Sequence, residues 1–154
     1  MIKYCGIDAG KGGSITFLTY ENDELINSSS YNMPETIHEL FSIVREEKPN
    51  MALLEEVHAM PQQGVVSMFT FGRNFGICES VLAGNMIPYI LKSPQYWQKL
   101  LSIKNQKGSS YAERKALLLA KAMALFPTSN VTKQNADSYL IALSCRKLNL
   151  AGEI

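Results

Sequence analysis

The sequence of 154 residues is poor in features that mark secreted, membrane-spanning and repetitive proteins. It has only three cysteines, Cys5, Cys78 and Cys145, and such an odd, scattered set excludes a disulfide framework and favours a reduced, cytoplasmic compartment. No run of about 18 apolar residues occurs, so we expect no membrane partner. The first three residues lead directly into a strand pattern, so we expect no signal peptide.

A large net charge is also absent, since the chain carries only +1 at pH 7. This average conceals a basic segment, residues 92–121, which has seven Lys or Arg residues and the single acid Glu113. A segment of this kind is either a solvated helix surface or a binding surface for a polyanion such as nucleic acid, and both interpretations stay open at this point.

The hydrophobic pattern predicts a single α/β domain over residues 1–154. Three strands followed by alternating helices and strands predict a mixed five-stranded sheet, antiparallel in its first three strands and parallel afterwards, with helices on both faces. Pro34 is expected in the first turn of the first helix. The predicted strands are 2–8, 14–20, 25–31, 51–55 and 87–92. The predicted helices are one within 34–50, 64–83, a short one after 93–94, one from 110 to about 126 and one from about 135 to 148. Ser110 and Glu113 have the spacing of a capping box at the start of the fourth of these helices.

The predicted helix 64–83 is apolar around more of its circumference than one buried face requires. One face can cover the sheet, and the other predicts contact with a second copy of the chain, which gives a homodimer. The alternative is that the last two helices of the same chain cover that second face. The candidate interface residues are Met68, Gly72, Phe75 and Gly76.

Three acidic residues stand where predicted elements end or begin. Asp8 ends the first strand, Glu55 ends the fourth, and Asp137 lies in the first turn of the last helix. The first and fourth strands are expected to be parallel neighbours, so their carboxyl ends meet at the edge where α/β proteins form sites. Individually the three could serve as a turn cap, a surface charge and a favourable charge on a helix dipole.

Three carboxylates brought together need either protonation or a cation. Oxygen ligands favour Mg²⁺, with Mn²⁺ as a substitute, and two such ions roughly 3.5–4 Å apart are the usual means of hydrolysing a phosphodiester. The sequence therefore predicts a two-metal phosphodiesterase site formed by Asp8, Glu55 and Asp137.

Four stretches resemble the RuvC family of Holliday-junction resolvases, within the RNase H-like superfamily and most like its compact bacteriophage members. They are GIDAGKGGSI (6–15), LLEEVHAMPQQGVVSMFTFGRNFGICESVLAG (53–84), IPYILKSPQYWQK (87–99) and NADSYLIAL (135–143). The resemblance covers nearly the whole chain. It implies a homodimer that nicks branched DNA, such as four-way junctions and also forks or flaps, on opposing strands with Mg²⁺ or Mn²⁺.

The resemblance extends to the acidic residues. Asp8 matches the aspartate of the first strand, Glu55 matches the family pattern Glu-x-Val, and Asp137 matches the aspartate of the pattern ADALxIA. The family usually places another Asp or His about three residues before that aspartate, where this chain has Gln134, preceded by Lys133. Gln134 offers a carbonyl oxygen as a further metal ligand but cannot act as a base, so this departure weakens one metal position.

Several residues outside the acidic set are expected to contact DNA. Lys11 belongs to the glycine-rich turn after Asp8, which we expect to let a phosphate backbone approach, and His58 stands where some family members place an aromatic that wedges into the junction. His58 could equally be a solvent-facing loop residue. The basic segment supplies Lys104, Lys107, Arg114 and Lys115.

The same sequence features leave two other functions open. A non-cleaving protein that binds branched DNA would fit the departure at Gln134. A phosphate-binding domain of the actin-like or sugar-kinase type would fit the glycine-rich turn, although those proteins need a second, repeated domain. Trp97, Phe69 and Phe71 are expected in the core and not in contact with DNA.

Overall fold

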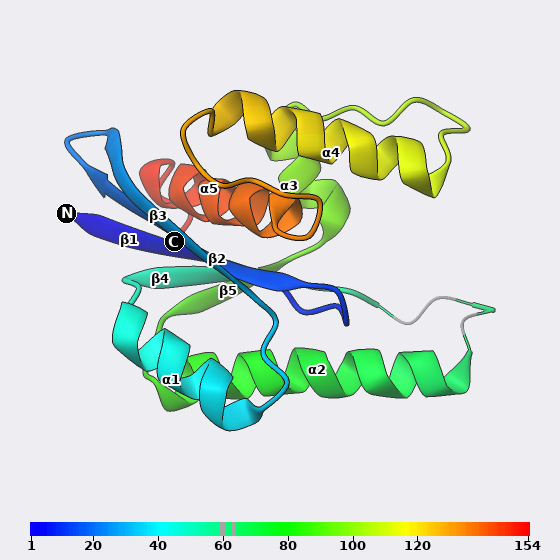
Figure 1. Cartoon of the computed structure of the whole chain (residues 1–154), viewed down its shortest axis with the longest axis horizontal. Coiled ribbons are helices and arrows are strands. Elements are labelled where there is room, and N and C mark those ends of the chain that lie inside the picture. Colours follow the sequence, from blue (N-terminus) through cyan, green and yellow to red (C-terminus); the bar gives the residue numbers. More distant parts are fainter. Residues whose placement is uncertain (59–60, 63) are drawn as a thin grey trace.

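The computed structural model describes residues 1–58, 61–62 and 64–154, which form one five-stranded sheet with helices on both faces (Figure 1). The strand order is β3-β2-β1-β4-β5, with β1, β2 and β3 antiparallel and β4 parallel to both β1 and β5. The predicted fold class is therefore confirmed. The strands are β1 (Ile2–Asp8), β2 (Ser14–Glu21), β3 (Glu24–Asn32), β4 (Met51–Glu55) and β5 (Tyr89–Lys92).

The helices form two layers, with α1 and α2 on one face of the sheet and α3, α4 and α5 on the other (Figure 1). Each layer buries its own apolar cluster against the sheet. The helices are α1 (Ile37–Glu47), α2 (Val65–Gly84), α3 (Pro94–Leu100), α4 (Tyr111–Leu125) and α5 (Ala136–Leu150). Among the described residues, none of these helices is both long and apolar enough to cross a membrane.

Local capping interactions fix where the helices begin. Ser110 and Glu113 form the predicted reciprocal capping box of α4. The prediction for Pro34 was wrong, because α1 begins at Ile37 and not at the proline. The hydroxyl of Thr36 accepts a hydrogen bond from the backbone N–H of Glu39, so Thr36 is the N-cap and satisfies one of the donors that the first turn of a helix leaves without a partner.

Strand β5 begins two residues later than predicted. Pro88 has no N–H to donate to a neighbouring strand, and its carbonyl accepts instead from the N–H of Ala52. The N–H of Ile87 donates to the carbonyl of Leu82 at the end of α2, so this residue belongs to the turn that leaves the helix.

Helix α5 lies directly on the central strand β1 because Gly6 has no side chain. A Cβ atom at Gly6 would lie 2.2 Å from the backbone nitrogen of Ala142 and 2.4 Å from the carbonyl oxygen of Ser138. The buried hydroxyl of Ser138 also hydrogen-bonds to Ser14 at 2.7 Å and to Thr16 at 2.6 Å, both on β2. These contacts fix the first turn of α5 relative to the ends of β1 and β2.

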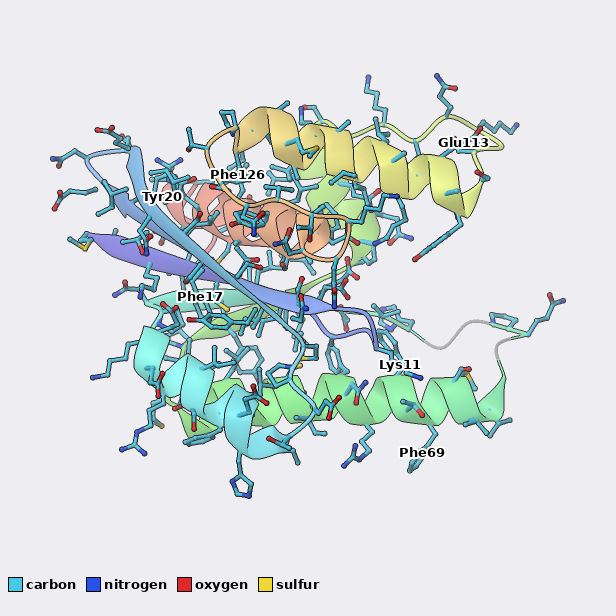
Figure 2. All side chains as sticks on the ribbon, viewed as in Figure 1. Lys11, Phe17, Tyr20, Phe69, Glu113 and Phe126 are labelled. Atoms are coloured by element: carbon cyan, nitrogen blue, oxygen red, sulfur yellow. The ribbon has the colours of Figure 1, made fainter. Side chains whose placement is uncertain are left out.

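The second face of α2 is not covered by the last two helices, because α4 and α5 lie on the opposite side of the sheet (Figure 1). That alternative to a dimer interface was wrong. A Cβ atom at Gly72 or Gly76 would meet nothing within 4 Å. Phe69 was expected in the core but is 74% exposed and points away from the sheet (Figure 2), because it lies on this same outer side of α2.

Candidate active site

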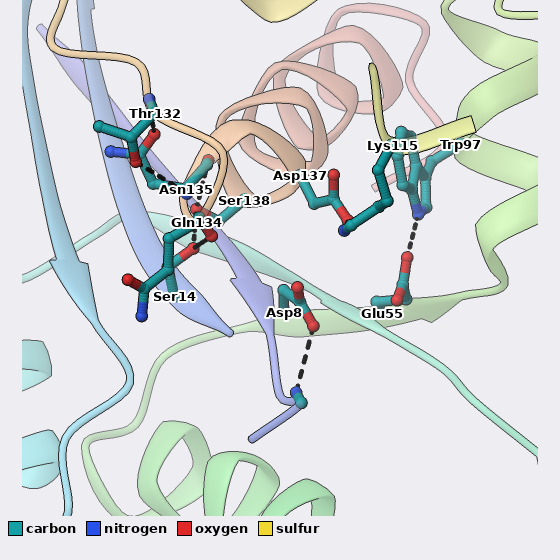
Figure 3. Close-up of polar contacts among 11 residues, drawn as sticks. Asp8, Ser14, Glu55, Trp97, Lys115, Thr132, Gln134, Asn135, Asp137 and Ser138 are labelled. Carbon is teal, nitrogen blue, oxygen red and sulfur yellow. Dashed lines mark hydrogen bonds and ion pairs between the residues drawn. The ribbon is translucent and has the colours of Figure 1, made fainter. Parts of the chain in front are cut away.

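A cavity of about 470 Å³ opens at the carboxyl ends of β1 and β4. The parallel register pairs Ile7 with Leu54, so Asp8 and Glu55, the next residue on each strand, end at the same level. Asp137 reaches the cavity from the first turn of α5, and all three acidic residues line it (Figure 3). The structure thus places together the three acidic residues that the sequence singled out.

Glu55 lies at the buried side of this cavity, against α3. Its carboxylate accepts a hydrogen bond from the indole N–H of Trp97, with 2.7 Å between Nε1 and Oε2. Burial, together with the negative charge of Asp8, raises the pKa of Glu55 to about 7, although the Trp97 hydrogen bond opposes this rise. Glu55 is therefore an acid that ionises near neutral pH unless a cation is nearby.

Burial likewise raises the pKa of Asp8, and the charge of Asp137 adds to the effect. The backbone N–H of Gly10 donates to Oδ1 of Asp8 at 3.1 Å, which partly offsets that rise. The turn is closed by a hydrogen bond from the N–H of Gly13 to the carbonyl of Gly10 at 2.8 Å. A Cβ atom at Gly13 would lie 2.0 Å from the carbonyl oxygen of Asp8, so this position requires glycine.

The raised pKa of Glu55 predicts a pH-dependent stability in the absence of metal. Between pH 4.5, the ordinary value, and about 7, the folded protein holds a proton that the unfolded chain has lost, so the free energy of unfolding falls as the pH rises. The full loss is about 3 kcal/mol above pH 7. Urea denaturation in EDTA at several pH values should show a slope that Glu55→Gln largely removes. An unchanged slope in that variant would assign the effect to other groups.

Asp137 forms an ion pair with Lys115, whose side chain enters the cavity from α4 (Figure 3). The Asp137 side chain is 13% exposed and the Lys115 side chain 36% exposed, so the pair is partly shielded from water. Burial alone would lower the pKa of Lys115, but the hydrogen bond to Asp137 and the charges of Asp137 and Asp8 raise it. The ammonium is therefore charged and balances part of the negative charge in the cavity.

The donor set suits a hard cation, because the three carboxylates offer only oxygen ligands of the kind that Mg²⁺ prefers. Gln134 lines the cavity, and its backbone carbonyl accepts a hydrogen bond from the Ser14 hydroxyl at 3.1 Å. Within residues 1–58, 61–62 and 64–154, however, no three Asp, Glu, His or Cys side chains are arranged to hold an ion as they stand.

The rim of the cavity is basic. Lys11, Arg114 and Lys133 are exposed and line it together with the half-buried acidic residues. Lys11 projects from the turn that follows β1 (Figure 2), and Arg114 donates a hydrogen bond to the carbonyl of Ser109 at 2.9 Å. The cavity therefore has acidic walls inside and positive charge at its entrance, which suits the approach of a phosphate group.

The remaining predicted DNA contacts lie outside this cavity. Lys104 and Lys107 are exposed in the segment between α3 and α4. His58 has a side chain that is 75% exposed, and its Nε2 atom lies 4.0 Å from a carboxylate oxygen of Glu56. Residues 59–60 and 63, part of the stretch 53–84 that carries the strongest resemblance, lie outside the described residues.

Sequence reasoning missed two features of the site. Trp97 was assigned to the core alone; it is 1% exposed, but its N–H is also the hydrogen-bond partner of Glu55. Lys115 was expected to contact DNA, whereas in the structure its ammonium donates a hydrogen bond to Asp137, 22 residues away in the sequence. Neither contact has a local signal in the sequence, because each joins residues of different elements.

Phe71, which was expected in the core, lines the cavity and does not belong to the buried core.

Comparison of whole structures places this arrangement among known folds. No protein-family model matches the sequence, and no curated protein matches it. RuvC of T. thermophilus in complex with a Holliday junction substrate superposes with a TM-score of 0.69 at 12% identity, covering 98% of this chain and 97% of that chain.

A second structure of Thermus thermophilus RuvC gives a TM-score of 0.64 at 13% identity, with 98% and 97% coverage. The Holliday junction resolvase of fowlpox virus gives 0.52 at 12% identity, covering 99% of this chain and 100% of that one. At these identities the similarity is one of three-dimensional structure. The chain has the RNase H-like fold seen in RuvC, as the resemblance of its four sequence stretches implied.

Proposed function

We propose that the protein is a metal-dependent endodeoxyribonuclease that nicks Holliday junctions and related branched DNA. The observation that carries this proposal is the cavity in which Asp8, Glu55 and Asp137 meet beneath a basic rim. It lies at the strand ends of a fold shared, over nearly its full length, with RuvC bound to a Holliday junction substrate. An acidic interior with a basic entrance is the charge pattern needed to bind metal ions and a phosphodiester together.

Asp8, Glu55 and Asp137 would hold two Mg²⁺ ions, with Mn²⁺ as a substitute, and the Gln134 amide oxygen can supply a further ligand. Such ions lower the pKa of an attacking water and neutralise charge on the leaving 3′ oxygen. The buried position of Glu55 and its hydrogen bond from Trp97 fix the orientation of this carboxylate before any ion binds. Lys11, Arg114 and Lys133 hold the DNA backbone at the entrance.

We further propose that the active form is a homodimer joined through α2. Val65, Val66 and Phe69 at the start of this helix are 74–79% exposed, and Gly72 and Gly76 have open space beside them. Two-fold symmetry in the protein would match the two-fold symmetry of an open four-way junction and bring two active sites to opposing strands.

A second candidate function is binding of branched DNA without cleavage. Two observations favour it: Gln134 is uncharged where the resemblance implies an acid or a histidine, and Lys115 is paired with Asp137. In that case the metal-binding set would be incomplete, while the basic rim would still hold DNA.

A cleavage assay distinguishes the two functions. A synthetic four-way junction and a linear duplex of the same sequence are incubated with the protein over a range of Mg²⁺ and Mn²⁺ concentrations, and with EDTA. The proposed nuclease gives paired, symmetric nicks in the junction only, and none in EDTA. Tight junction binding without nicks at any metal concentration would instead assign the binding function.

Lys104 and Lys107 provide a test of the DNA path beyond the cavity. If both contact phosphates, the logarithm of the binding constant should fall with the logarithm of salt concentration, with a slope of about −0.9 per contact. The double variant Lys104→Ala/Lys107→Ala should flatten this slope by nearly two units in a fluorescence titration with a junction. Lys48→Ala, at the C-terminal end of α1 on the other face of the sheet, serves as the control. A slope equal to that of the wild type would show that neither lysine contacts a DNA phosphate.

A further inference from the structure

We infer that Lys115 is a displaceable counter-ion that occupies the Asp137 carboxylate until a metal ion replaces it, so that it regulates metal loading of the site. This inference rests on the proposed function, because it assigns Asp137 to metal binding. It adds a role for a residue that the basic segment of the sequence placed only among the expected DNA contacts.

The geometry gives the first support. The Lys115 ammonium donates directly to Oδ2 of Asp137, inside the same cavity that Asp8 and Glu55 line. Its helix, α4, is held at its start by the capping box of Ser110 and Glu113, so the lysine stem leaves a fixed backbone position. Asp137 in turn lies on the buried helix α5, which packs on β1 at Gly6. The pair therefore joins two elements whose positions are set independently.

The balance of charge gives the second support. Three carboxylates line the cavity, and Lys115 is the basic residue paired with one of them in the described part of the chain. Arg114 and Lys133 remain at the exposed rim. Without Lys115, the charge of Asp137 would face Asp8 and Glu55 with no cation beside it. Repulsion between like charges in a shielded site makes that arrangement unfavourable.

Competition follows from these two facts. A metal ion that binds Asp137 must approach the same carboxylate, and repulsion between the ion and the ammonium prevents both from occupying it at full strength. Lysine is suited to leave, because its compact charge is carried on a flexible four-carbon stem. The displaced ammonium can then meet a phosphate at the basic rim.

Mn²⁺ titration of the DNA-free protein, followed by electron paramagnetic resonance, tests this competition directly. Lys115→Met removes the charge and keeps much of the stem, so it should bind Mn²⁺ about tenfold more tightly than the wild type. Lys115→Arg keeps a positive charge, and its guanidinium can donate two hydrogen bonds to the Asp137 carboxylate. This variant should therefore bind Mn²⁺ more weakly than the wild type. Lys121→Met, six residues along α4 and outside the residues that line the cavity, should leave the affinity unchanged.

Thermal unfolding gives a readout that needs neither DNA nor cleavage. In EDTA, Lys115→Met should unfold at a lower temperature than the wild type, and Mn²⁺ should raise its midpoint by more than it raises that of the wild type. If Lys115→Met does not fold, the Mn²⁺ affinity of Lys115→Arg, which should be weaker than that of the wild type, tests the competition by itself. Equal Mn²⁺ affinity in the wild type and both variants, with junction cleavage intact, would overturn the counter-ion role. A wild type that neither binds Mn²⁺ nor cleaves would instead overturn the proposed nuclease.

Discussion

Replacing Asp8 by asparagine should abolish junction cleavage and leave junction binding intact or tighter. Asp8 ends the central strand, is largely buried, and faces the same cavity as Glu55 and Asp137. Asparagine keeps the size of the side chain and an oxygen for the Gly10 N–H, but it removes the negative charge that would hold a metal ion. Since a bound ion contributes several kcal/mol to the transition state, cleavage should fall by about a thousandfold or more.

The control is a matched substitution at a surface aspartate. Asp23 lies in the turn between β2 and β3 with a side chain that is 83% exposed, and Asp23→Asn should cleave at the rate of the wild type. Rates are measured on a labelled four-way junction at saturating protein, and binding is measured on the same DNA without metal. Wild-type cleavage by Asp8→Asn would remove this residue from the reaction, and full cleavage in excess EDTA would exclude the metal.

A glutamate at Gly76 should convert the proposed dimer into a folded monomer that no longer makes paired nicks. A Cβ atom at this position would meet nothing within 4 Å outside the adjoining backbone of α2, so the fold has room for a side chain to begin there. In a dimer joined through α2, the same side chain would bury an uncompensated charge in each copy, at a cost of several kcal/mol per charge. The dissociation constant should then rise by about a thousandfold or more.

Light scattering measures this change, since two copies of the 17.1 kDa chain have a mass of about 34 kDa. Met123→Glu, on α4 at the opposite side of the sheet and 51% exposed, should stay dimeric. If α2 makes no intermolecular contact, Gly76→Glu should do no more than raise the free energy of unfolding by about 0.5–1 kcal/mol, because glutamate favours a helix over glycine. A wild-type mass near 17 kDa at micromolar concentration, with paired nicks retained, would contradict the dimer.

The sequence alone determined those parts of the structure that depend on local pattern. Short apolar runs and β-branched or aromatic residues identified all five strands, and the spacing of Ser110 and Glu113 identified the start of α4. The errors in α1 and β5 arose where a neighbouring residue decided the boundary, through the Thr36 hydroxyl in one case and the missing N–H of Pro88 in the other.

The position of Asp8, Glu55 and Asp137 at one sheet edge could also be predicted, because the order of elements determines which strands are neighbours and which ends meet. The exposure of Phe69 could not be, since the apolar pattern of α2 is the same whether its second face meets the chain's own helices or a separate partner. Only the placement of α4 and α5 on the far side of the sheet decided that question.

The ionic and hydrogen-bonding state of the site was decided by the tertiary structure. The pairing of Lys115 with Asp137, and of Trp97 with Glu55, joins side chains that are 22 and 42 residues apart in the sequence. Residue type and spacing determine which groups can carry charge and at which element ends they stand. Which of them lie within hydrogen-bond reach, and how far burial raises the pKa of Glu55, depends on how helices pack across the sheet, and a linear pattern carries no measure of that packing.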